Sequence, residues 1–127
     1  MIKIYHASDL HVRTSLTGII NNRRVLSLLK KISDHHDANC ASHTAFAVIT
    51  GDLTDSGSGG EHKKLREYLD TLDSRITVRV VPGNHDNGGG NGTEYRKKCA
   101  ERFDDLSGSL GFNPKFIKKY KKEYPGY

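Results

Sequence analysis

The sequence is poor in cysteine and lacks long hydrophobic runs. Its two cysteines, Cys40 and Cys99, do not form the set of spacings that predicts a disulfide framework. The apolar start of the chain is broken by Lys3 and closed by His6 and Asp9. We therefore expect neither a signal peptide nor a membrane span. A reducing, cytoplasmic setting without a membrane partner is the expectation for such a chain.

Positive charge is nearly balanced in residues 1–92 and concentrated in residues 93–127. The first range holds 11 Lys and Arg against 10 Asp and Glu, and the second holds 9 against 5. Most of the surplus lies in PKFIKKYKKEYPGY, the last segment of the chain. A basic tail with aromatic side chains could contact nucleic acid or a phosphorylated ligand. The helical spacing of Phe116, Ile117 and Tyr120 favours instead an amphipathic helix with its lysines in solvent.

Three short segments, residues 2–8, 44–50 and 76–81, have the residue types of β-strands. The middle one, TAFAVIT, is a continuous apolar run, which is typical of a strand buried on both faces. Apolar residues recur with helical spacing in RRVLSLLKKISDHH and EHKKLREYLDTL, which separate the strands. After the loop NGGGNG, the segment TEYRKKCAERFDDL begins with Thr93, which can cap a helix.

The order β-α-β-α-β predicts an α/β fold with a parallel sheet and right-handed crossovers. Neither an internal repeat nor a linker divides residues 1–127, so we expect a single domain.

Polar side chains follow each predicted strand. In open α/β sheets, ligands bind outside the carboxyl ends of the strands. Carboxylates gathered at one edge repel one another unless a cation joins them. Carboxylate, imidazole and amide groups suit divalent ions such as Mn, Fe or Zn, and one carboxylate could bridge two ions. The side chains concerned are Asp9 and His11, then Asp52 and Asp55, then Asn84, His85 and Asp86.

The motifs D-L-H, G-D-L-T-D and G-N-H-D follow successive strands and resemble the first three motifs of the calcineurin-like metallophosphoesterases. The resemblance implies the β-α-β-α-β half of an αββα sandwich. It also implies a hydrolase that cleaves a phosphodiester or phosphomonoester with two divalent metal ions. The cyclic-nucleotide phosphodiesterases are the most similar branch, and a DNA-repair exonuclease-like phosphodiesterase is the second enzyme hypothesis.

The resemblance also assigns roles to single residues. Asp9 and His11 would hold the first metal ion, Asp52 would bridge both ions, and Asn84 would bind the second. His85 would be the catalytic acid that meets the substrate. Asp55 resembles the carboxylate that orients this histidine. Asp86 is expected to be structural, as a turn cap.

The histidine motifs that complete the family's metal site are missing, because no histidine follows His85. The resemblance covers residues 1 to about 90, so the C-terminal half of the domain is expected to be absent. We expect a fragment of a longer protein that is inactive by itself. The alternative is a non-catalytic or truncated metal-binding module that acts through a partner or nucleic acid. Asp55 and His85 argue against this alternative, since a scaffold needs no catalytic acid.

The remaining histidines are expected to be structural. A zinc site needs two closely paired ligands and two more at a defined spacing, which DHHDANCASH lacks. NGGGNG is expected to be a mobile loop beside the site, because it lacks the G-x-x-x-x-G-K-[ST] pattern of a phosphate cradle. We expect the sheet interior for His6, a solvated helix end for His35, His36 and His43, and the surface for His62.

Overall fold

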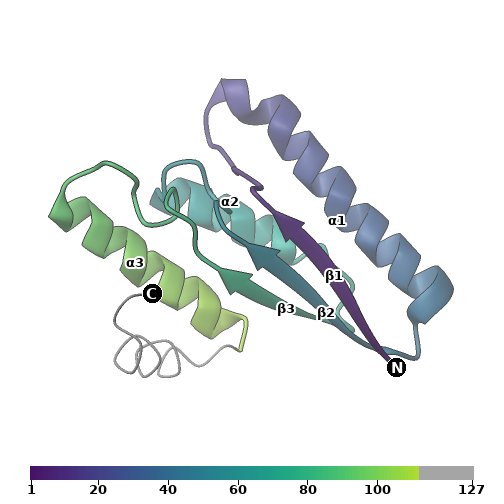
Figure 1. Ribbon diagram of the computed structural model, residues 1–127. Helices are drawn as coiled ribbons and strands as arrows, with labels where there is room; N and C mark the ends of the chain where they lie inside the picture. The colour runs from purple at the N-terminus through teal and green to yellow at the C-terminus, as the bar shows by residue number, and fades with distance from the viewer. Residues whose placement is uncertain (112–127) are drawn as a thin grey trace.

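The computed structural model describes residues 1–111, so the basic segment at residues 114–127 lies outside the described residues. Three strands form one parallel sheet in the order β1-β2-β3. Each strand coincides with its predicted range, and the predicted α/β fold is confirmed (Figure 1). The elements are β1 (Ile2–Ser8), η1 (Leu16–Gly18), α1 (Ile19–Cys40), β2 (Thr44–Thr50), α2 (Gly59–Leu69), β3 (Ile76–Val81) and α3 (Thr93–Ser109).

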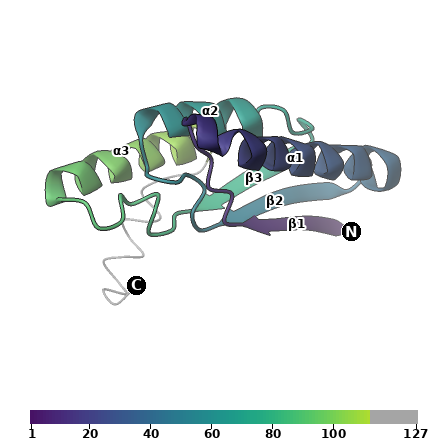
Figure 2. The same ribbon diagram turned by 90° about the horizontal axis from the view of Figure 1, so that it is seen from above.

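All three helices cover the same face of the sheet, as Figure 2 shows. Right-handed crossovers that always step in the same direction along a sheet place every helix on one side. Ala45, Ala47 and Ile49 of β2 face these helices and are buried, whereas Phe46 and Val48 face the other side and are half-buried. The prediction that this strand is buried on both faces is therefore wrong.

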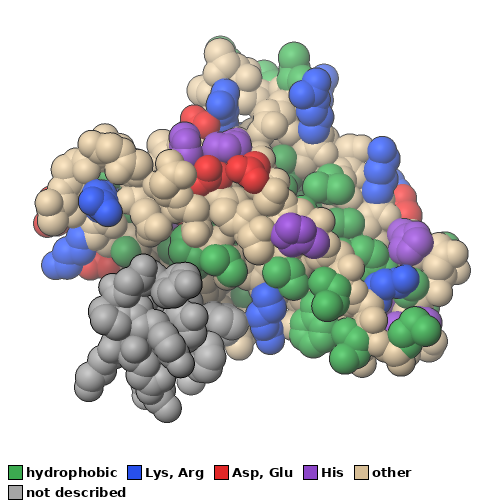
Figure 3. All heavy atoms as spheres, viewed as in Figure 1, with side chains coloured by type: hydrophobic (Ala, Val, Ile, Leu, Met, Phe, Trp, Pro, Cys, Tyr) green, Lys and Arg blue, Asp and Glu red, His purple; other side chains and the backbone are tan. Residues whose placement is uncertain are grey.

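The other face of the sheet carries apolar side chains within the described part of the chain. Ile2 and Ile4 of β1 are 65% and 63% exposed, and Val81 of β3 is 51% exposed. Figure 3 views the molecule from this side and shows hydrophobic side chains gathered over the strands. Successive side chains of a strand point to opposite faces of the sheet, so every residue next to a helix-facing one points to the open face.

The core lies between the sheet and the helices. Leu29 of α1, Ile49 of β2 and Leu65 of α2 are almost completely buried and belong to one cluster of packed apolar side chains. The first turn of α2 is fixed by a capping box: the Ser58 hydroxyl accepts from the Glu61 amide, and the Glu61 carboxylate accepts from the Ser58 amide. This helix therefore begins two residues before the predicted segment.

Two other helix boundaries differ from the prediction. Thr93 is the first residue of α3 rather than its cap, and Gly92 occupies the capping position without a side-chain hydrogen bond. Helix α1 runs from Ile19 to Cys40 and is longer than its apolar repeat. Packing against the sheet extends it beyond what local propensity indicates. None of the described helices is long and apolar enough to cross a membrane.

Three histidines lie in other environments than the sequence predicted. His6 falls in the same strand phase as Ile2 and Ile4, so it is exposed on the open face and bonds to the Thr50 hydroxyl at 2.8 Å. His36 is fully buried under α1, with its Nδ1 3.4 Å from the Tyr5 hydroxyl. His62 is 8% exposed, because the helix phase turns it toward α3. The predictions for these three side chains were wrong.

Candidate metal centre

Three candidate metal ligands have unusual backbone conformations. Asp9, His11 and Asp52 have φ angles of 54°, 46° and 43°, and they are the only non-glycine residues of the described part with positive φ. This left-handed region is costly for residues with a Cβ atom, and such strain clusters at functional sites. The surrounding structure therefore has to hold these three residues in place.

Backbone hydrogen bonds supply much of that restraint. The loop after β1 runs beside the loop after β2, and the Asp9 and His11 amides donate to the carbonyls of Gly51 and Asp52. Val12 and Thr54 then form an isolated parallel bridge. The two loops thus continue the pairing of β1 and β2 beyond the strand ends.

Asp86 ties the loops after β2 and β3 together. Its carboxylate is completely buried and accepts four hydrogen bonds. The donors are the Leu53 amide at 3.0 Å, the Thr54 amide at 2.8 Å, the Thr54 hydroxyl at 2.7 Å and the Gly83 amide at 2.9 Å. The structural role expected of Asp86 is thus larger than a turn cap, because the residue joins two segments that are distant in sequence.

Asp52 approaches the loop after β3 closely. Its Oδ1 accepts a 3.0 Å hydrogen bond from the His85 amide. A Cβ atom at Gly83 would lie 2.1 Å from this same Oδ1 and 2.3 Å from the Asp52 amide nitrogen. Glycine is therefore required at position 83 by the close approach of the Asp52 backbone and carboxylate, although its φ is ordinary.

Three side chains converge at the carboxyl ends of the strands. One ligand atom from each of His11, Asp52 and His85 lies within 4.8 Å of the others. His11 Nε2 is 3.9 Å from Asp52 Oδ2, and the two imidazole rings stand nearly perpendicular with centroids 4.8 Å apart. Figure 3 shows histidine and acidic side chains gathered at this edge. The imidazole of His11 and the carboxylate of Asp52 suit a divalent transition metal ion, and the second imidazole is close enough to serve as a further ligand or as a proton donor beside it.

Asp9, another predicted metal ligand, is not among the three converging side chains of this cluster. Asp9 and Asn84 are exposed on the loops after β1 and β3, so they flank the cluster on the same edge of the sheet. His85, which was expected to act only as an acid, is by contrast a member of the cluster.

The contact between Asp55 and His85 is made by the backbone. The Asp55 carbonyl oxygen lies 2.5 Å from His85 Nδ1, which as the N–H tautomer would donate to it. This hydrogen bond is the main cause that raises the pKa of His85; burial opposes it, and the nearby carboxylates, Asp52 foremost, raise the pKa further. The carboxylate of Asp55, expected to orient His85, is turned elsewhere.

That carboxylate lies against the loop after β1 instead. Asp55 Oδ1 accepts from Arg13 Nη2 at 2.9 Å and lies 3.5 Å from His11 Nδ1. Carboxylates beside the second nitrogen of a metal-binding histidine fix the tautomer and orientation of the ring. Arg13 is a site residue that the sequence did not indicate. The available sign of its role was its position two residues after His11 on the same loop.

Comparison with known proteins gives three bacterial relatives. A probable glycerophosphodiester phosphodiesterase of Arcobacter nitrofigilis is 29% identical over 80% of this chain and 34% of its own length. A 3',5'-cyclic-nucleotide phosphodiesterase of Nostoc sp. is 29% identical over 67% of this chain and 31% of its own length. A probable cyclic nucleotide phosphodiesterase of Coxiella burnetii is 36% identical over 67% of this chain and 32% of its own length.

The chain thus spans about a third of the length of these relatives. A family model described as calcineurin-like phosphoesterase matches residues 2–125, which is nearly the whole sequence and includes all three polar loops. The chain belongs to the calcineurin-like phosphoesterase family.

Proposed function

We propose that this chain carries part of the active site of a metal-dependent phosphodiesterase. The observation that supports this most strongly is the convergence of His11, Asp52 and His85 at one edge of the sheet, on loops held in strained conformations. Divalent ions at such a site lower the pKa of bound water toward about 7 and neutralise charge on phosphoryl oxygens.

The residues divide into ligands and an acid. Asp9 and His11 would hold a first ion, Asp52 would be shared if two ions bind, and Asn84 would contribute an amide oxygen to the second. The chain has no histidine after His85, so its own ligands for the second ion are Asp52 and Asn84. We therefore expect residues 1–127 alone to bind the second ion weakly and to hydrolyse a generic phosphodiester negligibly.

His85 is proposed as the proton donor to the leaving group. With Nδ1 donating to the Asp55 carbonyl, Nε2 is the nitrogen that can carry or release the second ring proton. The raised pKa of His85 increases the fraction of imidazolium near neutral pH, which suits a general acid. Arg13 and Asp55 are proposed to position His11 through its Nδ1.

The substrate proposed is a small phosphodiester such as a 3',5'-cyclic nucleotide or a glycerophosphodiester, because the relatives carry those names. Acting as a metal-binding module without turnover remains the competing hypothesis. His85 separates the two, since a module of that kind does not require it to release a proton.

The test is to measure Mn²⁺ binding to the full chain by titration calorimetry and by the electron paramagnetic resonance of the free ion. We expect Asp52→Asn to weaken Mn²⁺ binding about 100-fold, because it removes the shared charged ligand. His85→Gln should leave metal content nearly unchanged. In a protein extended to the length of its relatives, it should lower turnover of a generic phosphodiester about 10²- to 10⁴-fold.

His43→Gln is the matched control for the histidine substitution, because His43 lies at the opposite end of the sheet, just before β2. Loss of Mn²⁺ by His85→Gln equal to that of Asp52→Asn would make His85 a metal ligand and reject the acid role. Metal binding without turnover in the extended protein would support the module hypothesis.

A further inference from the structure

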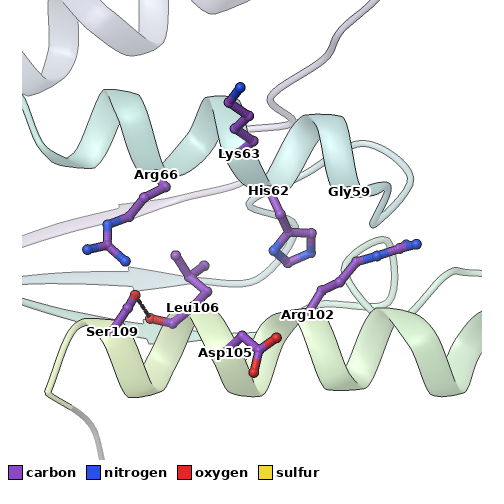
Figure 4. Close-up of a pocket in the computed structure, with 8 residues that line it drawn as sticks. All are labelled: Gly59, His62, Lys63, Arg66, Arg102, Asp105, Leu106 and Ser109. Atoms are coloured by element: carbon purple, nitrogen blue, oxygen red, sulfur yellow. Dashed lines mark hydrogen bonds between the residues drawn. The ribbon is translucent and has the colours of Figure 1, made fainter.

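A second polar site lies in the helix layer, away from the candidate metal centre. A cavity of about 260 Å³ opens between α2 and α3 and is lined by side chains from both helices (Figure 4). This volume is slightly below the range of about 300–1,000 Å³ that is usual for drug-sized ligands. The cavity therefore has room for a small ligand.

His62 projects from the first turn of α2 into the cavity toward α3, as Figure 4 shows. Only 8% of His62 is exposed to solvent, yet neither ring nitrogen has a hydrogen-bond partner in the described part of the chain. A buried polar group without a partner costs about 1–3 kcal/mol. A ligand that supplies the missing partner would remove this cost.

The charged side chains around His62 indicate whether such a ligand would be an anion or a cation. Burial is the main cause that lowers the pKa of His62; Asp86 opposes it, and the Arg102 guanidinium lowers it further. The neighbouring Glu61 carboxylate also raises this pKa.

Arg66 and Lys63 add two more cations to the lining, and Arg66 Nε is paired with Asp70 Oδ1 at 3.2 Å. Asp105 is the only carboxylate among the residues that line the cavity. The lining thus has a net positive charge, which favours an anion.

Donor groups remain available around the cavity. Arg102 Nη1 donates to the Gly57 carbonyl at 2.9 Å and lies 4.0 Å from Cys99 Sγ, whereas its Nε and Nη2 groups have no hydrogen-bond partner within residues 1–111. A Cβ atom at Gly59 would lie 3.7 Å from Arg102 Nε, so this guanidinium borders the first turn of α2.

We propose that the cleft between α2 and α3 binds a phosphate group through His62 and Arg102, with Arg66 adding positive charge to the lining. A tetrahedral oxyanion presents several acceptor oxygens, so it can receive a hydrogen bond from the imidazole N–H together with one from the Arg102 guanidinium. Arg66 lies toward the other end of the cavity (Figure 4). This site is independent of the proposed metal chemistry, because it shares no residue with the strand-end loops. The ligand is either free phosphate or the phosphate group of a small phosphomonoester.

The proposal is tested by following the amide ¹H–¹⁵N spectrum of the full 127-residue chain during titration with inorganic phosphate. A chelator removes metal so that the strand-end loops bind no phosphate, and sodium chloride keeps the ionic strength constant. We expect saturable shifts confined to residues 59–66 and 102–109. Ribose 5-phosphate is the second probe. Tighter binding of inorganic phosphate would identify free phosphate as the ligand, and tighter binding of ribose 5-phosphate would identify a phosphomonoester.

Substitutions of opposite charge sharpen this test. Arg66→Gln should weaken phosphate binding about threefold, because it removes a positive charge from the lining. Asp105→Asn should strengthen it about threefold, since it removes the only acidic lining group. The matched controls are Arg96→Gln and Asp104→Asn on α3, neither of which lines the cavity, and both should change affinity less than twofold.

His62→Leu should abolish saturable binding, and His62→Gln should retain part of it because the amide can donate. The second variant also keeps the test intact if the first does not fold. Equal losses in Arg66→Gln and Arg96→Gln, or weaker binding by Asp105→Asn, would overturn the proposal. Shifts spread over all basic side chains would show nonspecific attraction and would overturn it as well.

Discussion

The strand-end loops and the α2–α3 cleft both combine histidine, aspartate and arginine, but they hold them in different ways. In the loops, the buried carboxylate of Asp86 receives four hydrogen bonds, and the His85 ring is bound to a carbonyl. In the cleft, the ring of His62 is buried without a partner. The pKa of His85 is accordingly raised and that of His62 is lowered.

The difference arises from the backbone around each histidine. Loops at the ends of parallel strands present free amide and carbonyl groups, so a carboxylate such as Asp86 can be fully satisfied there. The backbone of α2 and α3 is already paired within each helix beyond its first turn, so a side chain between helices depends on other side chains or a ligand. Backbone groups of the loops therefore supply hydrogen bonds to Asp86 and His85, whereas the cleft gives the His62 ring no partner among the described residues.

The largest effect is expected from removing the carboxylate that joins two of the loops. Asp86→Ala should lower the free energy of unfolding by about 3 to 5 kcal/mol, because four donors lose a charged acceptor in the interior. Urea unfolding followed by circular dichroism measures this. Asp70→Ala is the control, since Asp70 is exposed and forms only a surface ion pair with Arg66, worth about 0.5 kcal/mol. Similar losses in both variants would contradict the role of Asp86.

A more local effect is expected at the close approach between Gly83 and Asp52. Gly83→Ala should weaken Mn²⁺ binding about 100-fold, because the added Cβ would displace the Asp52 carboxylate from the cluster. Calorimetric titration with Mn²⁺ measures this affinity. Gly90→Ala is the control, because a Cβ atom there meets nothing within 4 Å and φ is not positive. Unchanged Mn²⁺ affinity in Gly83→Ala would show that the close approach between Gly83 and Asp52 does not affect metal binding.

The smallest effect is expected in the cleft, where it depends on pH. The lowered pKa of His62 means that the unfolded chain, with a pKa near about 6.5, binds the proton more readily than the folded chain. Above about pH 6.5, His62 is neutral in both states and its titration does not change the free energy of unfolding. Below that pH, the free energy of unfolding falls until the pH reaches the pKa of His62 in the folded protein. His62→Leu should remove this fall, and at pH 7 it should stabilise by on the order of 1 kcal/mol.

Urea midpoints of the two proteins between pH 5 and pH 8, measured without phosphate, test this prediction. All other titratable groups are common to the two proteins, so the difference between the two curves isolates His62. Parallel curves would show that burial of His62 has no consequence for stability, and would weaken the contrast between the cleft and the loops.

The sequence alone indicates the strands and the edge of the sheet at which several candidate site residues meet. Strand ranges 2–8, 44–50 and 76–81 agree with the structure, because β-branched and apolar residues in short runs bounded by glycine and polar residues have few alternatives. The motifs around His11, Asp52 and His85 placed all three on one sheet edge, since parallel strands share their carboxyl ends. Such local patterns are sufficient when topology follows from the order of the elements.

Tertiary contacts alone decided the rest. The sequence could not show that the Asp55 carboxylate pairs with Arg13 while its carbonyl binds His85, because a residue name does not tell which of its groups faces the neighbour. It also could not show that His6 is exposed and His62 buried. Those outcomes depend on which face of the sheet the helices cover and on how α2 and α3 are rotated about their axes, and both are set by packing across distant segments.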